Sequence, residues 1–272
     1  MEITKNPKIF EHQTDSCLHR RRTLYLVRHG EAIHNVLERQ AQERAQQEAQ
    51  RLQLSAEETA ARMEQARKAV LEDASLRDAP LTDLGREQAR QCGQRLQELV
   101  QHQRVAHPPT EAMVSPLRRT LETCQIILES SPSLSSTTKL KAHIREEIQE
   151  RRTQLPPDTP HPRKHLLRYT QTDDRFVMNN IEKRSSAAVN DEVRVRESKD
   201  MLRERASKLF DLLLEMEHRH ILIVSHKGYL RELERGLLGL DDSPLFENAE
   251  LRVYRVQFTR GERSLESIER LV

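Results

Sequence analysis

The stretch Thr23-Leu-Tyr-Leu-Val27 is a short apolar run that ends on the polar triplet Arg28-His29-Gly30. A second run with a similar ending lies far downstream, where Ile221-Leu-Ile-Val224 is followed by Ser225-His226-Lys227-Gly228. Continuous apolar runs of this length predict strands that are buried on both faces of a parallel sheet. Ligands of open α/β sheets bind beyond the carboxyl ends of the strands. Both histidines are therefore candidate site residues.

Helical spacing of apolar residues predicts three helices around these strands. The first begins after Thr82, a good N-cap residue, and continues to about residue 100. The second covers about 117–128, and the third, about 202–216, leads directly into the strand at Ile221. A late strand is predicted at 251–258. Helices that alternate with buried strands indicate an α/β fold.

Two polar segments are interpreted as additions to this framework. Residues 36–78 are rich in Glu, Gln, Arg and Ala and contain a capping box at Ser55-Ala-Glu-Glu58. They predict a helical hairpin, which we interpret as a solvated surface feature and not as a dedicated partner site. Residues 153–200 are polar and rich in proline at their start, which predicts a long loop or lid with short helices. With these insertions, we expect residues 1–272 to form a single domain.

Composition excludes several classes of protein. The 45 basic and 43 acidic residues leave a net charge of +2, which gives no sign of a nucleic-acid-binding surface. The first nineteen residues contain no apolar run typical of a signal peptide, and no stretch reaches the roughly 18 apolar residues of a membrane span. Three cysteines without metal-like spacing fit a reducing compartment. We therefore expect a cytoplasmic protein with no nucleic-acid or membrane partner.

The cysteines themselves have no predicted chemical role. Cys92 and Cys124 fall on the apolar stripes of predicted helices, so they are expected to be small core residues. Cys17 is the third. No cluster of metal-ligand residues is visible in the sequence, so neither a metal nor another cofactor is expected.

The polar ends of the two apolar runs suggest chemistry on a phosphate. A neutral imidazole is a competent nucleophile toward a phosphoryl group near pH 7, and the neighbouring Arg28 can hold phosphate oxygens in a bidentate fork. Arg119 lies near a predicted helix N-terminus, which also favours anions. Asn35 and a protonated His226 complete a set of donors suited to a phosphate dianion. The alternative for His29 alone is a buried histidine beside a surface arginine.

Several motifs, in their order along the chain, resemble those of the histidine phosphatase superfamily, also called the phosphoglycerate-mutase-like family. The last of them also resembles a fungal and plant phosphatase-like branch. The resemblance is carried by Arg28-His29-Gly30-Glu31 with His34-Asn35, Leu81-Thr82-Asp83-Leu84-Gly85, Ser115 through Arg119 to Thr123, His226-Lys227-Gly228, and Phe246-Glu-Asn-Ala-Glu250-Leu-Arg252. It implies a three-layer α/β/α sandwich around a largely parallel sheet, with the helical hairpin as an insertion.

The resemblance also implies a role for each matched residue. His29 would form the phosphohistidine, and His226 would assist catalysis while it lines the phosphate pocket. Arg28, Arg119 and Asn35 would bind the phosphate. The family uses an acidic residue as the proton donor to the leaving group.

The position of this proton donor is ambiguous in the sequence. Glu146, Glu147 and Glu150 are close together, and each taken singly is more often a solvated surface charge. The spacing of Ile148-Gln-Glu150 before Pro157-Asp158-Thr159 fits the family best. We therefore predict Glu150, with Glu146 as the second choice.

Other polar residues are weaker candidates. His34 is as compatible with a turn surface as with a substrate contact, and Lys227 departs from the small residue often found there. The basic cluster Arg163-Lys164-His165, with Arg168, is interpreted as a solvated loop, although it would suit a second anionic group on a substrate.

Three functions remain open on the sequence. Residues 32–40 lack the mutase-specific pattern, and no Tyr-Gly pair follows Glu150. Hydrolysis of a phosphomonoester is therefore favoured over a cofactor-dependent phosphoglycerate mutase. A non-catalytic phosphate-binding scaffold is the third reading, disfavoured because the nucleophile and both arginines are present. The expected partner is a phosphorylated substrate whose class the sequence leaves open, as it does the oligomeric state.

Overall fold

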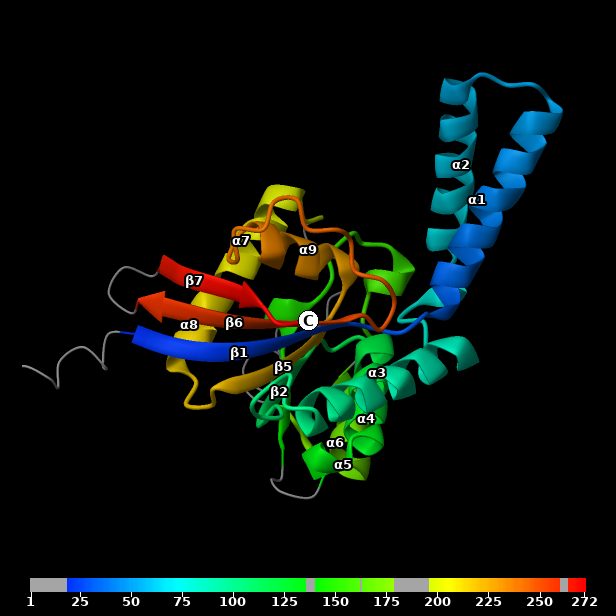
Figure 1. Ribbon diagram of the computed structural model, residues 1–272. Coiled ribbons are helices and arrows are strands. Elements are labelled where there is room, and N and C mark those ends of the chain that lie inside the picture. The colour runs from blue at the N-terminus through cyan, green and yellow to red at the C-terminus, as the bar shows by residue number, and fades with distance from the viewer. Residues whose placement is uncertain (1–18, 136–139, 162, 179–195, 260–263) are drawn as a thin grey trace, which may run out of the picture.

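The computed structural model describes residues 19–135, 140–161, 163–178, 196–259 and 264–272, so Cys17 lies outside the described residues. One seven-stranded sheet runs through the protein in the order β4-β3-β2-β5-β1-β6-β7 (Figure 1). Its strands are β1 (His19–Arg28), β2 (Glu111–Val114), β3 (Ala142–Ile144), β4 (Phe176–Val177), β5 (His220–Ser225), β6 (Leu251–Thr259) and β7 (Ser264–Arg270). The strands from β4 to β1 pair in parallel, whereas β6 and β7 pair antiparallel.

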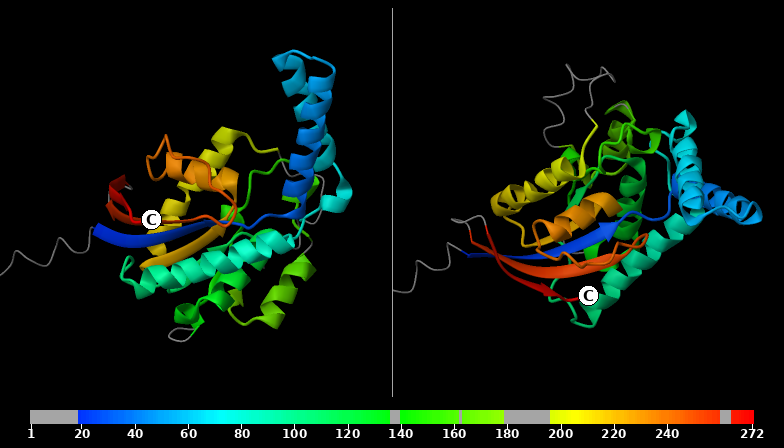
Figure 2. Two further views of the ribbon diagram at one scale, coloured as in Figure 1. Left: turned by 45° about the vertical axis from the view of Figure 1, so that its right-hand side comes forward. Right: turned by 90° about the horizontal axis from the view of Figure 1, so that it is seen from above.

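Helices cover both faces of this sheet, which confirms the three-layer α/β fold. One face carries α3 (Asp83–Gln101), α4 (Arg118–Ser130), α5 (Pro132–Ser135) and α6 (Arg163–Thr172). The other carries α7 (Lys199–Ser207), α8 (Leu209–Glu215) and α9 (Lys227–Arg235), as Figure 2 shows from two further sides.

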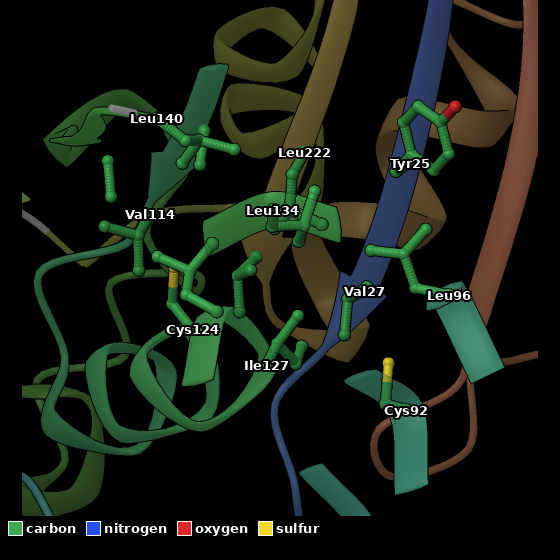
Figure 3. Packing of buried hydrophobic residues seen from close by; sticks show 14 of the residues in the cluster. Tyr25, Val27, Cys92, Leu96, Val114, Cys124, Ile127, Leu134, Leu140 and Leu222 are labelled. Carbon is green, nitrogen blue, oxygen red and sulfur yellow. The ribbon is translucent and has the colours of Figure 1, made fainter. Parts of the chain in front are cut away.

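Alternate residues of the central strands supply two separate cores. Tyr25 and Val27 pack with α3 and α4 in the first core (Figure 3), while Leu24 and Leu26 pack with α7, α8 and α9 in the second. Burial on both faces is the reason that these strands read as continuous apolar runs. Cys92 and Cys124 lie buried in the first core as predicted, and burial raises the pKa of each thiol to about 12.

The sequence places β1, β5, β6, α3 and α4 correctly, whereas several other elements differ from the expectation. The helix expected at 202–216 is divided into α7 and α8 at Lys208, where the amide of Asp211 donates to the carbonyl of Lys208 three residues back. Strands β2, β3 and β7 were not foreseen. The segment 153–200, expected to be a loop or lid with short helices, contains α6 and also the unforeseen two-residue strand β4, which extends the sheet. Residues 179–195 lie outside the described part.

The predicted hairpin consists of α1 (Ile33–Arg51) and α2 (Ala56–Leu71) and projects from the body as an arm (Figures 1 and 2). Ser55 and Glu58 form the expected capping box at the start of α2: the Ser55 hydroxyl accepts from the Glu58 amide, and the Glu58 carboxylate accepts from the Ser55 amide. Ala41, Ala45 and Ala49 form the buried stripe of α1. Among the described residues, no helix is long and apolar enough to cross a membrane.

Short 3-10 helices link the remaining elements. They are η1 (Ala74–Leu76), η2 (Glu146–Ile148) and η3 (Pro156–Asp158). The last two lie in the segment that follows β3.

The loop after β1 is fixed by a close approach of two backbones. Thr82 caps α3 by accepting from the Gly85 amide, and the Thr82 amide donates to the carbonyl of Glu31. A Cβ at Gly85 would overlap that carbonyl, and one at Gly30 would overlap the carbonyl of Gly85. The two glycines therefore allow the start of α3 to lie against the loop that contains His29.

We expect Gly85→Ala to destabilise the protein by about 2–3 kcal/mol, because the methyl group has rigid backbone as its neighbour and an overpacked site costs about that much. Urea denaturation measures the change in the free energy of unfolding. Leu84→Ala is the matched control, since Leu84 is exposed and its loss should change stability by less than about 0.5 kcal/mol. Equal stability of the two variants would contradict the close-approach argument.

Candidate active site

Parallel pairing of β1 with β5 brings the two predicted histidines together. The register aligns Arg28 with Ser225, so His29 and His226 leave neighbouring strands at the same level of the sheet. The His29 amide donates to the carbonyl of Ser225 at 3.0 Å. The two imidazole rings lie edge to face with their centroids 5.2 Å apart, and both are buried.

The hydrogen bonds of His29 determine its tautomer. Its Nδ1 lies 2.7 Å from the carbonyl oxygen of Gly30, which only accepts, so Nδ1 carries the hydrogen. The Nε2 atom accepts from Nε of Arg119 at 3.2 Å. Burial, followed by the charges of Arg119 and Arg28, lowers the pKa of His29 well below its ordinary value. The imidazole is therefore neutral, with its lone pair on Nε2.

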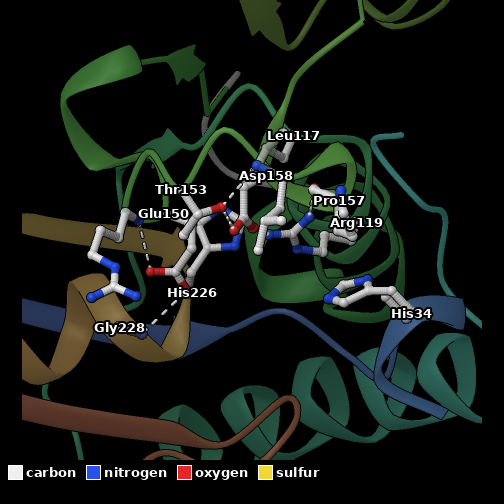
Figure 4. Close-up of polar contacts among 12 residues, drawn as sticks. His34, Leu117, Arg119, Glu150, Thr153, Pro157, Asp158, His226 and Gly228 are labelled. Carbon is white, nitrogen blue, oxygen red and sulfur yellow. Dashed lines mark hydrogen bonds and ion pairs between the residues drawn. The ribbon is translucent and has the colours of Figure 1, made fainter. Parts of the chain in front are cut away.

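Arg119 is the most deeply buried cation of the site. It lies in the first turn of α4 and is 1% exposed. Its Nη1 donates to the carbonyl of Pro157 at 2.6 Å, and its Nη2 donates to Oδ1 of Asp158 at 3.1 Å (Figure 4). In this structure, a carbonyl and a carboxylate of the η3 segment thus occupy the fork of the guanidinium.

Several buried nitrogens around His29 have no hydrogen-bond partner within the described residues: Nε of Arg28, Nδ1 of His34 and Nδ1 of His226. Other nitrogens of the same side chains do have partners. Nη1 of Arg28 donates to the carbonyl of Phe246, and Nε2 of His226 lies 2.7 Å from Oγ of Ser115. Buried polar atoms are normally satisfied. An oxyanion beside His29 would supply acceptors to such a group of nitrogens.

His226 is neutral in this state. Burial, followed by the positive charge of Arg119, lowers its pKa well below the ordinary value. The protonated form expected from the sequence would therefore require a bound anion to favour it.

Asn35, expected from the sequence to bind phosphate, uses its side chain for two local contacts in the structure. Its side-chain oxygen accepts from the Ala32 amide at the start of α1, and its side-chain nitrogen lies 3.0 Å from Nε2 of His34. His34 is buried, with its ring centroid 6.4 Å from that of His29. Asn35 thus orients His34, the residue to which the sequence had given less weight.

Glu150 is the glutamate that reaches this group. Its Oε2 accepts from the Gly228 amide at 3.2 Å, and its Oε1 accepts from the Arg151 amide at 2.9 Å (Figure 4). Burial, and next the negative charge of Asp158, raise the pKa of this carboxyl. Glu147 is exposed and Glu146 is half-buried.

The position of the Glu150 carboxyl group explains why the residue two places after His226 is a glycine, Gly228. A Cβ at this position would overlap Oε1 of Glu150. A side chain there would therefore displace the carboxyl group from the start of α9.

The residues that bind the backbone of His29 and Gly30 were not predicted from the sequence. The carbonyl of His29 accepts from the Ala249 amide and from the side chain of Asn248. The Gly30 amide donates to Oγ1 of Thr123 at 3.0 Å. The signal was available, because Asn248 lies in the Phe246–Arg252 motif, but a motif alone does not tell which atom it contacts.

Two of the other weaker candidates have exposed side chains. Lys227 is exposed at the start of α9, and Arg168 is exposed on α6. The side chains of 163–165 are outside the described part of the chain. Within the described ranges, no group of three or more His, Cys, Asp or Glu residues is arranged to hold a metal ion.

Comparison with known proteins agrees with this architecture. The sequence model of the histidine phosphatase superfamily (branch 1) matches residues 73–270. The structure is similar to that of mycobacterial hydrolase 1, at 18% identity and a TM-score of 0.51, over 93% of this chain and 98% of that one.

It is also similar to the ecdysone phosphate phosphatase from Bombix mori in complex with tungstate, at 16% identity and a TM-score of 0.52, over 90% of this chain and 92% of that one. A search of curated proteins found no match. At these identities the structural likeness concerns the fold alone, whereas the sequence match covers most of the chain. This chain therefore belongs to the histidine phosphatase superfamily, branch 1.

Proposed function

We propose that this chain is a phosphatase that hydrolyses phosphomonoesters through a phosphohistidine formed on His29. The observation that carries the proposal is the state of His29: it is neutral and buried, Gly30 fixes its hydrogen on Nδ1, and its Nε2 lone pair lies beside Arg119. A nucleophile of this kind needs no further activation by a base.

The reaction would proceed in two displacements. In the first, Nε2 of His29 bonds to phosphorus while the bond from phosphorus to the ester oxygen breaks, and Glu150 gives its proton to the departing oxygen. In the second, water attacks phosphorus, the bond to Nε2 breaks, and the Glu150 carboxylate takes a proton from that water. Donors preorganised around the phosphoryl group would stabilise the charge that develops in both steps.

The buried cations and imidazoles fit the phosphate in this scheme. Arg28 and Arg119 would bind its oxygens, and a dianion beside His226 would raise the pKa of that imidazole and favour its protonated form. Asp158 must leave Nη2 of Arg119 before that nitrogen can bind phosphate. Hydrolysis is favoured over phosphoryl return to a sugar acid because the mutase-specific residues are missing from 32–40.

His29→Ala should abolish turnover and remove an acid-labile phosphoenzyme that the wild-type protein forms on brief mixing with radiolabelled substrate. The variant should keep its fold, because β1 is buried through its apolar residues and not through His29. Circular dichroism checks the fold. Label that persists in His29→Ala, or that appears on Ser115, would contradict the mechanism.

Glu150→Gln should slow the hydrolysis of an alkyl phosphate by about 10²-fold or more, since a general acid contributes that much to a poor leaving group. It should barely affect p-nitrophenyl phosphate, whose leaving group departs without a proton. The raised pKa keeps Glu150 protonated to higher pH, so wild-type activity on the alkyl ester should be present below this pKa and fall as pH rises through it. The exposed Glu147→Gln is the matched control. A selective defect in Glu146→Gln instead would move the proton donor by four residues.

Asp158→Asn should strengthen competitive inhibition by inorganic phosphate by about fivefold, because the phosphate then no longer displaces a charged carboxylate from Arg119. Loss of the Asp158 charge also lowers the pKa of Glu150, so the fall in alkyl-phosphate activity should shift to lower pH. Asp174→Asn, at an exposed carboxylate, serves as the control. Weaker or unchanged inhibition by phosphate in Asp158→Asn would show that Asp158 does not compete for the site.

A further inference from the structure

We propose that Arg205 is a positioning residue that holds Glu150 in place for proton transfer; the proposal rests on the phosphatase function proposed above. Arg205 lies on α7, remote in sequence from every motif of the site. Its side chain is nearly buried, at 12% exposure.

Arg205 donates to the backbone of the segment that leads to Glu150. Its Nη1 lies 2.8 Å from the carbonyl of Glu147 and 2.8 Å from that of Gln149, and its Nη2 lies 3.2 Å from the carbonyl of Glu150. One guanidinium thus binds three carbonyls within four residues. The segment needs such support because η2 is a single turn that ends at Ile148, and Glu150 lies beyond it in no helix or strand.

Glu197 extends this support to the other side of Glu150. Its carboxylate accepts from Nε of Arg205 at 2.8 Å and from Nη2 at 2.7 Å. The same carboxylate accepts from the Arg152 amide, and the Glu197 amide donates to the Arg152 carbonyl. The chain is therefore held two residues after Glu150 as well as before it.

Arg205 also connects this segment to the helix that meets the carboxyl group. Its guanidinium lies over the ring of Tyr229, 5.5 Å from the centroid. Tyr229 follows Gly228, whose amide donates to Oε2 of Glu150. Arg205 thus sets the distance between the Glu150 backbone and the donor that orients the Glu150 side chain.

The geometry leaves little tolerance for error. A proton donor must lie within hydrogen-bond reach of the departing oxygen, and a displacement of about 1 Å can cost as much as 10²-fold in rate. Loss of Arg205 should therefore impair proton donation while the nucleophile and the phosphate-binding arginines stay in place, since no hydrogen bond of Arg205 within the described residues involves His29, Arg28 or Arg119.

The test compares Arg205→Gln with wild type on glycerol 2-phosphate, an alkyl ester, and on p-nitrophenyl phosphate. We expect kcat/KM for the alkyl ester to fall by about tenfold or more, and kcat/KM for p-nitrophenyl phosphate to change by less than about twofold. Arg205→Lys should show a smaller selective loss, because an ammonium cannot reproduce the fork. Arg203→Gln is the matched control: Arg203 lies on the same helix, half exposed, and pairs with Glu232.

Two further variants separate positioning from general stability. Glu197→Gln leaves Arg205 intact and should show the same selective loss in weaker form. In a Glu150→Gln background, Arg205→Gln should cause no additional loss on the alkyl ester, because the proton donor on which it acts is already absent.

Equal losses on both esters, or losses that multiply in the double variant, would overturn the proposal and leave the phosphatase function standing. A wild-type protein that hydrolyses neither ester and forms no phosphoenzyme would instead remove the proposed function, and this inference with it.

Discussion

The pairing of β1 with β5 is the constraint on which the rest of the site depends. Parallel strands end at the same edge of a sheet, so their pairing alone places His29 beside His226. Thr123 and Asn248 then hold the backbone around His29, and the Gly30–Gly85 contact fixes the loop beyond it. Each support comes from a different part of the chain, which allows a three-layer fold to immobilise one short loop.

Burial has opposite consequences for the ionisable groups of the site. It disfavours the charged form of each, so it lowers the pKa of His29 and raises that of Glu150. A neutral base and a protonated acid are the forms needed for attack on phosphorus and for departure of an alcohol. Arg119 remains buried because internal acceptors, Pro157 and Asp158, satisfy its nitrogens in the absence of a phosphate.

The sequence was sufficient for β1, β5 and β6, for α3 and α4, and for the hairpin, because each has a local pattern: an apolar run, a cap or a capping box. It was insufficient for β2, β3 and β4, which have only two to four residues, for β7, and for the division of the third predicted helix at Lys208. At the site, histidines and arginines next to strand or helix ends could be predicted. The contacts of Arg205 and Asp158 could not, because they join segments about 40 to 60 residues apart whose own sequences look like ordinary polar surface.

The arm formed by α1 and α2 has a consequence for how this protein can vary. Among the described elements, the two helices make extensive contacts only with each other, and the buried stripe of α1 consists largely of alanine. Ion pairs such as Arg67 with Glu38 and Arg62 with Glu48 join them along their length. A matched pair of helical turns added or removed beyond Arg39, which pairs with Glu31 of the loop, would therefore change the reach of the arm while the loop at its base kept its geometry. The length of the arm can therefore change in evolution while the active-site residues keep their positions.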